Sequence, residues 1–142
     1  MKTKIVFLLI VILLSVPACS ASSSSLELTC NDFREQQHIK KDLTMSIGDE
    51  ITISLCSNPS TGFQWLEQST ISDNKIVQQT GYQYVAPRGK GGQPPAPGSA
   101  GNSVWTFKAL ESGEVTIDME YSRPWEGGEK KQWTCELSVK VK

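Results

Sequence analysis

Apolar and polar residues alternate through most of this sequence, and this period of two constrains the fold more than any other feature. The clearest runs cover residues 51–55, 115–121 and 133–141. Such alternation is typical of a strand with one buried face. Shorter strand-like runs are expected at 26–30, 43–46, 63–66, 76–85 and 104–109, and residues 32–37 are expected to form one helical turn. Seven or eight short strands separated by turns predict an all-β, two-sheet sandwich with an immunoglobulin-like arrangement.

Most of the large aromatic residues fall inside the strand-like runs. This placement predicts that they belong to the core. The expected core aromatics are Trp65, Tyr82, Tyr84, Trp105 and Trp133.

Residues 1–18 are typical of an export signal. Lys2 and Lys4 precede an apolar run at 5–14, which is too short for a permanent membrane span. Small residues before Cys19 resemble a lipoprotein signal, in which this cysteine is lipidated after cleavage. Pro17 is atypical of that signal, so ordinary cleavage near Ala18 is the alternative. The expected protein is exported, and either lipid-anchored in the cell envelope or secreted.

The mature chain is expected to contain a serine-rich flexible tether at 19–25 and one domain at 26–142. Removal of the signal leaves 12 basic against 15 acidic residues, a net charge of −3. This balance argues against a nucleic-acid partner. A domain of this length can bury a core without metal or oligomer support, so we expect a monomer.

Three segments between the expected strands have the composition of specialised loops. Residues 57–65 read Ser-Asn-Pro-Ser-Thr-Gly-Phe-Gln-Trp, in which the proline and glycine favour a turn. Residues 87–101 are rich in glycine and proline. Residues 122–128 place Trp125 between a proline and a Glu-Gly-Gly run, where burial in the core is not expected. A large aromatic residue on a loop is a typical contact residue.

These loops, in this order, resemble those of the chagasin-like inhibitors of papain-family cysteine proteases. That family carries an Asn-Pro-Thr-Thr-Gly-aromatic loop, a Gly-x-x-Gly loop and an Arg-Pro-Trp loop. The resemblance covers residues 38–142, with Ser60 in place of a threonine. It implies three groups of protease-binding residues: Asn58, Pro59, Ser60, Thr61, Gly62 and Phe63; Gly98, Ser99, Ala100 and Gly101; and Arg123, Pro124 and Trp125.

The resemblance also implies how these loops work. They would form a wedge that fills the active-site cleft, with the tip at Ser60 and Thr61 near the catalytic cysteine and histidine. Trp125 would pack on an aromatic residue beside the cleft, and the second loop would approach the opposite wall. Residues 89–92 offer an alternative register for the second loop. If the strands run mostly up and down, all three loops lie at one end of the sandwich, and the turns at Gly48 and Gly113 lie at the other.

Three cysteines remain in the expected domain. Cys30 and Cys56 end two strand-like runs, and an antiparallel pairing of those strands would let them form a disulfide near the binding end. Closure of that loop would stabilise the domain by about 3–4 kcal/mol. Cys135 shares the parity of its apolar neighbours, so we expect it to be a free thiol in the core.

Two other classes of function are weaker. An immunoglobulin-like adhesion or scaffold module would explain the sandwich, but not the two specific loop sequences together. Catalysis and metal binding have little support, because His38 is the only histidine and no Cys-x-x-Cys spacing occurs. We therefore expect no cofactor and no metal, and His38 is expected to be an exposed residue before a strand.

Overall fold

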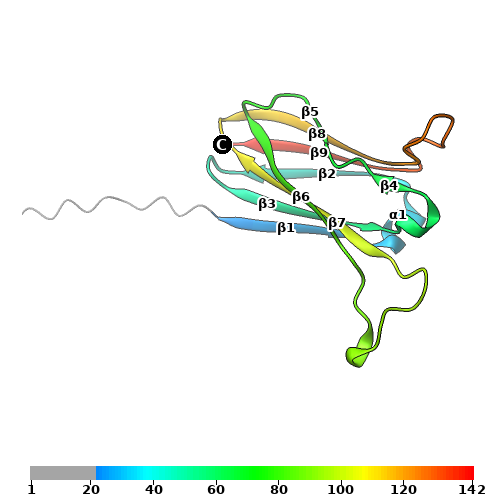
Figure 1. Cartoon of the computed structure of the whole chain (residues 1–142). Helices are drawn as coiled ribbons and strands as arrows, with labels where there is room; N and C mark the ends of the chain where they lie inside the picture. The colour runs from blue at the N-terminus through cyan, green and yellow to red at the C-terminus, as the bar shows by residue number, and fades with distance from the viewer. Residues whose placement is uncertain (1–21) are drawn as a thin grey trace, which may run out of the picture.

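The computed structural model describes residues 22–142, and most of these residues lie in strands (Figure 1). One short α-helix and two 3-10 turns, at Pro59–Thr61 and Lys90–Gly92, accompany the strands of this part of the chain. The elements are, in chain order, β1 (Ser23–Leu28), α1 (Cys30–Glu35), β2 (His38–Met45), β3 (Glu50–Ser57), β4 (Gln64–Trp65), β5 (Thr70–Ile71), β6 (Val77–Val85), β7 (Gly101–Ala109), β8 (Gly113–Ser122) and β9 (Trp133–Val141).

The strands form two sheets, which confirms the expected all-β, immunoglobulin-like sandwich. One sheet has the order β1-β3-β7-β6, and the other has the order β2-β9-β8-β4 with β5 also beside β8. Most neighbours are antiparallel, but β1 pairs with β3 in parallel and β2 pairs with β9 in parallel. The simple up-and-down arrangement is therefore wrong at both N-terminal strands. Each of these joins the edge of a sheet that later strands complete.

The core lies between the two sheets and follows the alternation of the sequence. Along β7, alternate residues from Gly101 to Ala109 are buried, and Trp105 and Phe107 are fully enclosed. The two most deeply buried indoles keep their hydrogen bonds: Trp65 Nε1 donates to the Cys56 carbonyl at 2.9 Å, and Trp105 Nε1 donates to the Glu67 carbonyl at 3.0 Å. These bonds remove the cost of burying an unpaired donor.

Three of the expected core aromatics, Tyr82, Tyr84 and Trp133, are less buried than their place in strand-like runs predicted. Tyr84 is 41% exposed, because it lies near the end of the edge strand β6. Tyr82, two residues earlier, still packs on Trp105 with ring centroids 5.2 Å apart. Trp133 points inward as expected but is only partly buried, since it begins β9 at the margin of the core.

The N-terminal segment also differs from expectation. Residues 23–25, expected in a flexible tether, are the first half of β1 and pair with residues 50–52 of β3. Strand pairing uses backbone N–H and C=O groups, so a run of serines can join an edge. The expected export signal, Cys19 and the rest of the expected tether lie outside the described residues. Within residues 22–142, no helix is long and apolar enough to cross a membrane.

Helix α1 begins earlier than the turn expected at 32–37. Thr29 caps it, with Thr29 Oγ1 accepting from the Asp32 N–H at 3.3 Å and the Thr29 N–H donating to Asp32 Oδ2 at 2.6 Å. The hydroxyl and backbone N–H of Thr29 lower the pKa of Asp32 by favouring its charged form. Phe33 anchors the helix, because its side chain is fully buried.

A disulfide joins Cys30 to Cys56, with their Cα atoms 5.1 Å apart. The antiparallel pairing that we expected behind this bond is wrong. β1 and β3 run parallel, and only parallel strands bring both of their C-terminal ends to the same end of a sheet. Cys135 is free and fully buried, and burial raises the pKa of its thiol to about 12.

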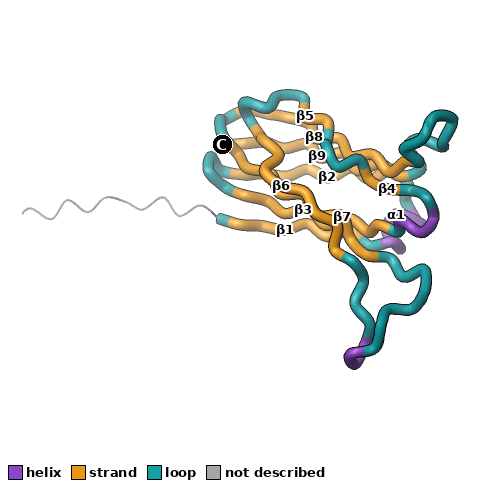
Figure 2. Tube along the Cα trace, in the orientation of Figure 1, coloured by secondary structure: helices purple, strands orange, loops and turns teal. Residues whose placement is uncertain are grey.

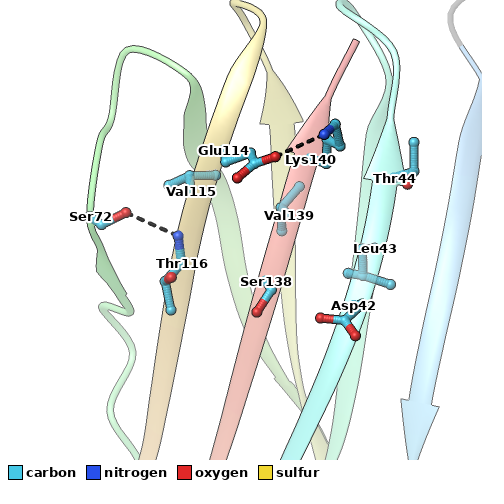
Figure 3. Close-up of a pocket in the computed structure, with 10 residues that line it drawn as sticks. All are labelled: Asp42, Leu43, Thr44, Ser72, Glu114, Val115, Thr116, Ser138, Val139 and Lys140. Atoms are coloured by element: carbon cyan, nitrogen blue, oxygen red, sulfur yellow. Dashed lines mark hydrogen bonds and ion pairs between the residues drawn. The ribbon is translucent and has the colours of Figure 1, made fainter.

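The outer face of the five-stranded sheet is polar (Figure 3). Lys140 Nζ lies 2.8 Å from Glu114 Oε1, and Ser72 Oγ accepts from the Thr116 N–H at 2.9 Å. The ion pair is exposed on both sides, so its contribution to stability is small.

Candidate functional site

Three loops project from one end of the sandwich (Figure 2). They are the connection after β3 (residues 58–63), the connection between β6 and β7 (86–100) and the connection between β8 and β9 (123–132). Asn58 Nδ2 donates to the Gly98 carbonyl at 2.9 Å, which joins the first loop to the second. The Arg123 guanidinium lies over the Phe63 ring, 4.4 Å from its centroid, which joins the first loop to the third. The structure therefore brings together all three of the sequence-predicted groups.

The tip of the first loop is a closed turn. Pro59–Thr61 forms a 3-10 turn, in which the Thr61 N–H donates to the Asn58 carbonyl at 3.1 Å. The Thr61 hydroxyl donates to the same carbonyl at 2.7 Å, and the Ser60 hydroxyl donates to Asn58 Oδ1 at 2.6 Å. Pro59, Ser60 and Thr61 are exposed. The tip is thus an exposed segment whose shape is fixed by its own hydrogen bonds.

Gly62 has two reasons to be glycine. Its φ of +80° lies in the left-handed region, which a side chain disfavours. A Cβ atom built on it would lie 2.9 Å from Trp125 Cη2. The first loop therefore approaches the indole of the third loop more closely than any residue with a side chain allows.

The third loop carries Trp125, which is 51% exposed. Its backbone is closed by the Arg123 N–H, which donates to the Glu129 carbonyl at 2.8 Å, and by the Gly128 N–H, which donates to the Trp125 carbonyl at 3.1 Å. Lys130 Nζ donates to the Arg123 carbonyl at 2.5 Å and to the Trp125 carbonyl at 3.2 Å. The indole is thus held outside the core by an ordered loop.

A continuous stack of aromatic rings and one guanidinium supports this end of the molecule. Successive members lie between 4.4 and 5.8 Å apart, measured between ring centroids or from the guanidinium carbon to a ring centroid. Arg123 Nε is buried without a hydrogen-bond partner. At this atom the guanidinium is held by its contacts with the neighbouring rings. The stack runs from α1 to the third loop through Phe33, Trp133, Tyr121, Phe63, Arg123 and Trp125.

This stack changes the interpretation of two sequence-predicted contact residues. Phe63 and Arg123 are partly buried against one another, and Tyr121 OH accepts from the Asn58 N–H at 3.0 Å. Phe63 and Arg123 are therefore placed to support the exposed tips at Ser60 and Trp125, rather than to be exposed contact residues themselves. The sequence predicted Arg123 in a loop and Phe63 where a loop meets a strand-like run, but it gave no sign that the two contact each other.

The second loop is partly different from expectation. Gly98, with φ of +76°, and Ala100 are exposed, and Ser99 is half-buried. Gly101 is not in the loop: it is the buried first residue of β7, where a Cβ atom would lie 2.3 Å from the Val85 carbonyl oxygen. This glycine therefore permits close strand packing. The alternative segment at 89–92 forms a 3-10 turn, whereas the bond from Asn58 places residue 98 at the shared edge.

Three polar residues at this end were not predicted from the sequence. Arg34 of α1, Glu129 and Gln132 line a hollow whose apolar wall includes Phe63 and Trp133. Arg34 belongs to a helix that the parallel pairing of β1 and the disulfide bring beside the loops. No local signal marks such a residue, because its position depends on contacts between distant segments.

Among residues 22–142, this end shows no arrangement of side chains that is typical of a catalytic site. His38 is exposed at the start of β2, with Nδ1 3.0 Å from Thr134 Oγ1, and the buried Cys135 thiol is not activated. Within residues 22–142, no group of three or more metal-ligating side chains gathers. A rigid sandwich with ordered loops and an exposed tryptophan at one end defines a binding protein.

Comparison with known proteins identifies the class of binding protein. Residues 44–139 match the model of the chagasin family peptidase inhibitor I42, and the chain belongs to this family. Amoebiasin-2 of Entamoeba histolytica is 32% identical over 100 residues, which cover 70% of this chain and 76% of that relative. Chagasin of Trypanosoma cruzi is 28% identical over 92 residues, which cover 63% of this chain and 79% of that relative.

Solved structures show the same fold. The crystal structure of the cysteine protease inhibitor EhICP2 from Entamoeba histolytica matches with a TM-score of 0.63 and 27% identity, over 84% of this chain and 97% of that chain. PbICP-C, solved in complex with falcipain-2, matches with a TM-score of 0.55 and 18% identity, over 84% of this chain and 99% of that chain. At that identity the second likeness concerns the fold alone.

Proposed function

We propose that this protein inhibits papain-like cysteine proteases as a monomer, by placing its three loops in the active-site cleft. The observation that carries the proposal is the meeting of the three family loop sequences at one end, joined by the Asn58–Gly98 hydrogen bond and the Phe63–Arg123 contact. Membership of a family of peptidase inhibitors supports it.

The tip at Ser60 and Thr61 approaches the catalytic cysteine and histidine of the protease. The tip occupies the cleft as a 3-10 turn fixed by hydrogen bonds from Thr61 and Ser60. The order of this turn before binding lowers the entropy cost of association. A closed turn also presents no extended peptide bond for cleavage, so the loop blocks the site without acting as an efficient substrate.

Trp125 and the second loop contact the two sides of the cleft. Trp125 is half exposed in the free protein and packs on an aromatic residue of the protease. Burial of a tryptophan covers about 150–250 Å², so burial of its exposed half at about 25 cal/mol per Å² contributes on the order of 2–3 kcal/mol before ordering costs. Gly98 and Ala100, on the opposite side, allow close approach to the backbone.

We further propose that the protein is exported and that Cys19 carries a lipid anchor. The positive start, the apolar run at 5–14 and the small residues before Cys19 support this assignment. Replacement Cys19→Ala is expected to release the protein from membranes or to stall its processing. A native protein that is wholly soluble, with an unmodified amino terminus, would exclude the anchor.

Titration of papain with the purified domain, residues 22–142, tests the inhibitory function. The domain should abolish activity at a stoichiometric ratio, and Trp125→Ala should raise the inhibition constant at least tenfold, which needs about 1.4 kcal/mol. The thermal midpoint should hardly move, because Trp125 lies outside the core. Ile47→Ala is a matched control, since Ile47 is 52% exposed but lies at the other end of the sandwich. A flat titration across several papain-like proteases would instead favour an adhesion module.

A further inference from the structure

The chain enters the domain at a fixed point on the end opposite the loops. The Ser22 N–H donates to Asp49 Oδ1 at 2.9 Å, and the Glu50 N–H donates to the Ser22 carbonyl at 3.0 Å. The Asp49 carboxylate also accepts from the Ser46 N–H at 2.8 Å. In Figure 1, the start of β1 and the C terminus lie at one end, and α1 and the β8–β9 connection lie at the other.

The distance from Cys19 to this entry point is short. Cys19 precedes Ser22 by three positions, and an extended chain spans at most about 3.6 Å per residue, so the two residues lie within about 11 Å. β3 runs from Glu50, beside Ser22, to Ser57, next to the first loop. At about 3.3 Å per residue its length is about 25 Å. An acyl chain on Cys19 would therefore be tethered near the end of the domain opposite the loops.

Two of the large apolar side chains on the surface lie at this same end. Ile47 is 52% exposed and Leu110 is 37% exposed. The backbone segments that carry them adjoin, because the Gly48 N–H donates to the Ala109 carbonyl at 2.9 Å. The exposed Lys142 adjoins them, since its carbonyl accepts from the Ile47 N–H at 3.2 Å. Apolar side chains beside a lysine are suited to the interface of a bilayer. There the apolar side chains enter the headgroup region, and the lysine ammonium contacts lipid phosphates.

We propose that this anchor end, formed by Ser22, the 46–49 turn, Leu110 and Lys142, rests on the lipid surface that holds the Cys19 acyl chains. The three loops then point away from the membrane, toward proteases that arrive from the aqueous side. The inference rests on the lipid anchor of the proposed function, and it adds an orientation that the short connection from Cys19 to Ser22 imposes.

The test uses the full-length lipidated protein in phosphatidylcholine vesicles that contain a headgroup spin label. A fluorescent probe is attached to the introduced thiol of Ile47→Cys or, separately, of Ser60→Cys; the buried Cys135 does not compete in the folded protein. We expect quenching at position 47 to be at least threefold stronger than at position 60. Insertion of twelve glycine and serine residues between Ser20 and Ala21 should leave vesicle binding intact and remove that difference.

The possible failures are distinguishable. Equal quenching at the two positions in the anchored protein of natural length would overturn the orientation while leaving the anchor in place. If the natural protein and its Cys19→Ala variant bind vesicles equally weakly, both the anchor and the orientation are wrong. Neither result changes the papain titration in solution, which tests inhibition alone.

Discussion

The two longer loops of the binding end are held in different ways. The β8–β9 connection, residues 123–132, has paired backbone groups, a lysine that bonds two of its carbonyls and a guanidinium stacked on Phe63. The β6–β7 connection, residues 86–100, has local bonds from Gln93 to Lys90 and from Ser99 to Ala96, and its bond to the first loop comes from Asn58. Both project from the same end of the sandwich (Figure 1).

This difference indicates a division of labour in recognition. In the proposed function, the β8–β9 connection, with the first loop and α1, is a preorganised surface that would meet a protease at low entropic cost. The β6–β7 connection has few tertiary contacts, so it is expected to open locally and adapt to the cleft wall. Affinity should therefore depend steeply on the first surface and weakly on the second.

The largest effect is expected from removal of the disulfide that ties α1 to the end of β3. The double replacement Cys30→Ser and Cys56→Ser should lower the free energy of unfolding by about 3–4 kcal/mol, because the unfolded chain loses a closed loop. Urea titration measures this loss. The unaltered domain in reducing buffer, where the disulfide is open and no side chain is replaced, controls for the chemistry of the change. An unchanged urea midpoint in the double variant would show that packing of Phe33 alone holds α1.

The next effect concerns Arg123, which we expect to position Trp125 against Phe63. Arg123→Ala should raise the inhibition constant for papain at least tenfold, about 1.4 kcal/mol, and change the near-ultraviolet circular dichroism of the stacked rings. Arg123→Lys should recover only part of the affinity, since an ammonium lacks the planar face. Arg88→Ala in the β6–β7 connection is the matched control and should stay within twofold. Equal losses of affinity in Arg123→Ala and Arg88→Ala would contradict the division of labour between the two connections.

A smaller effect is expected from the hydrogen bond between the first and second loops. Asn58→Ala removes the donor to the Gly98 carbonyl, so amide hydrogen exchange in residues 86–100 should become faster. The inhibition constant should rise about three- to tenfold, in line with the loss of about one hydrogen bond. Ser60→Ala is the control, because it removes a contact to Asn58 Oδ1 and leaves the bond to residue 98 intact. Unchanged exchange would mean that the β6–β7 connection needs no such bond.

The smallest effect is expected from a change of length. Two glycines inserted after Gln93 should alter the inhibition constant less than twofold, because loop-closure entropy grows slowly with length. The same insertion after Glu126 should weaken inhibition at least tenfold, since it displaces the indole from its stack. Similar constants for the two variants would show that the two connections are equally adaptable.

Several features of the site were predictable because their signals are local. Pro59 and Gly62 mark a turn through their own backbone preferences, and the Pro124 and Glu-Gly-Gly context of Trp125 predicted a loop residue. The structure places both segments as expected, with Trp125 half exposed. The inward parity of Cys135 was equally local, and the structure buries it.

Other features were not predictable, because they depend on which strands become neighbours. The serines at 23–25 have the composition of a tether, but in the structure they pair in parallel with the edge of β3. Gly101 has the sequence context of a loop residue, but in the structure it lies in β7, close to the Val85 carbonyl oxygen. Trp133 has the parity of a core residue, but its place at the margin of the sheet leaves it partly exposed.

The sequence by itself determined the sandwich class, the positions of its turns and the location of the three loops. Alternation and turn chemistry act between residues that are close along the chain. The tertiary structure alone decided the parallel pairing of β1 with β3, the place of α1 beside the loops and the stack that joins Phe63, Arg123 and Trp125. These contacts join residues up to 60 positions apart. Their geometry follows from the register and packing of the whole sandwich, which no local pattern records.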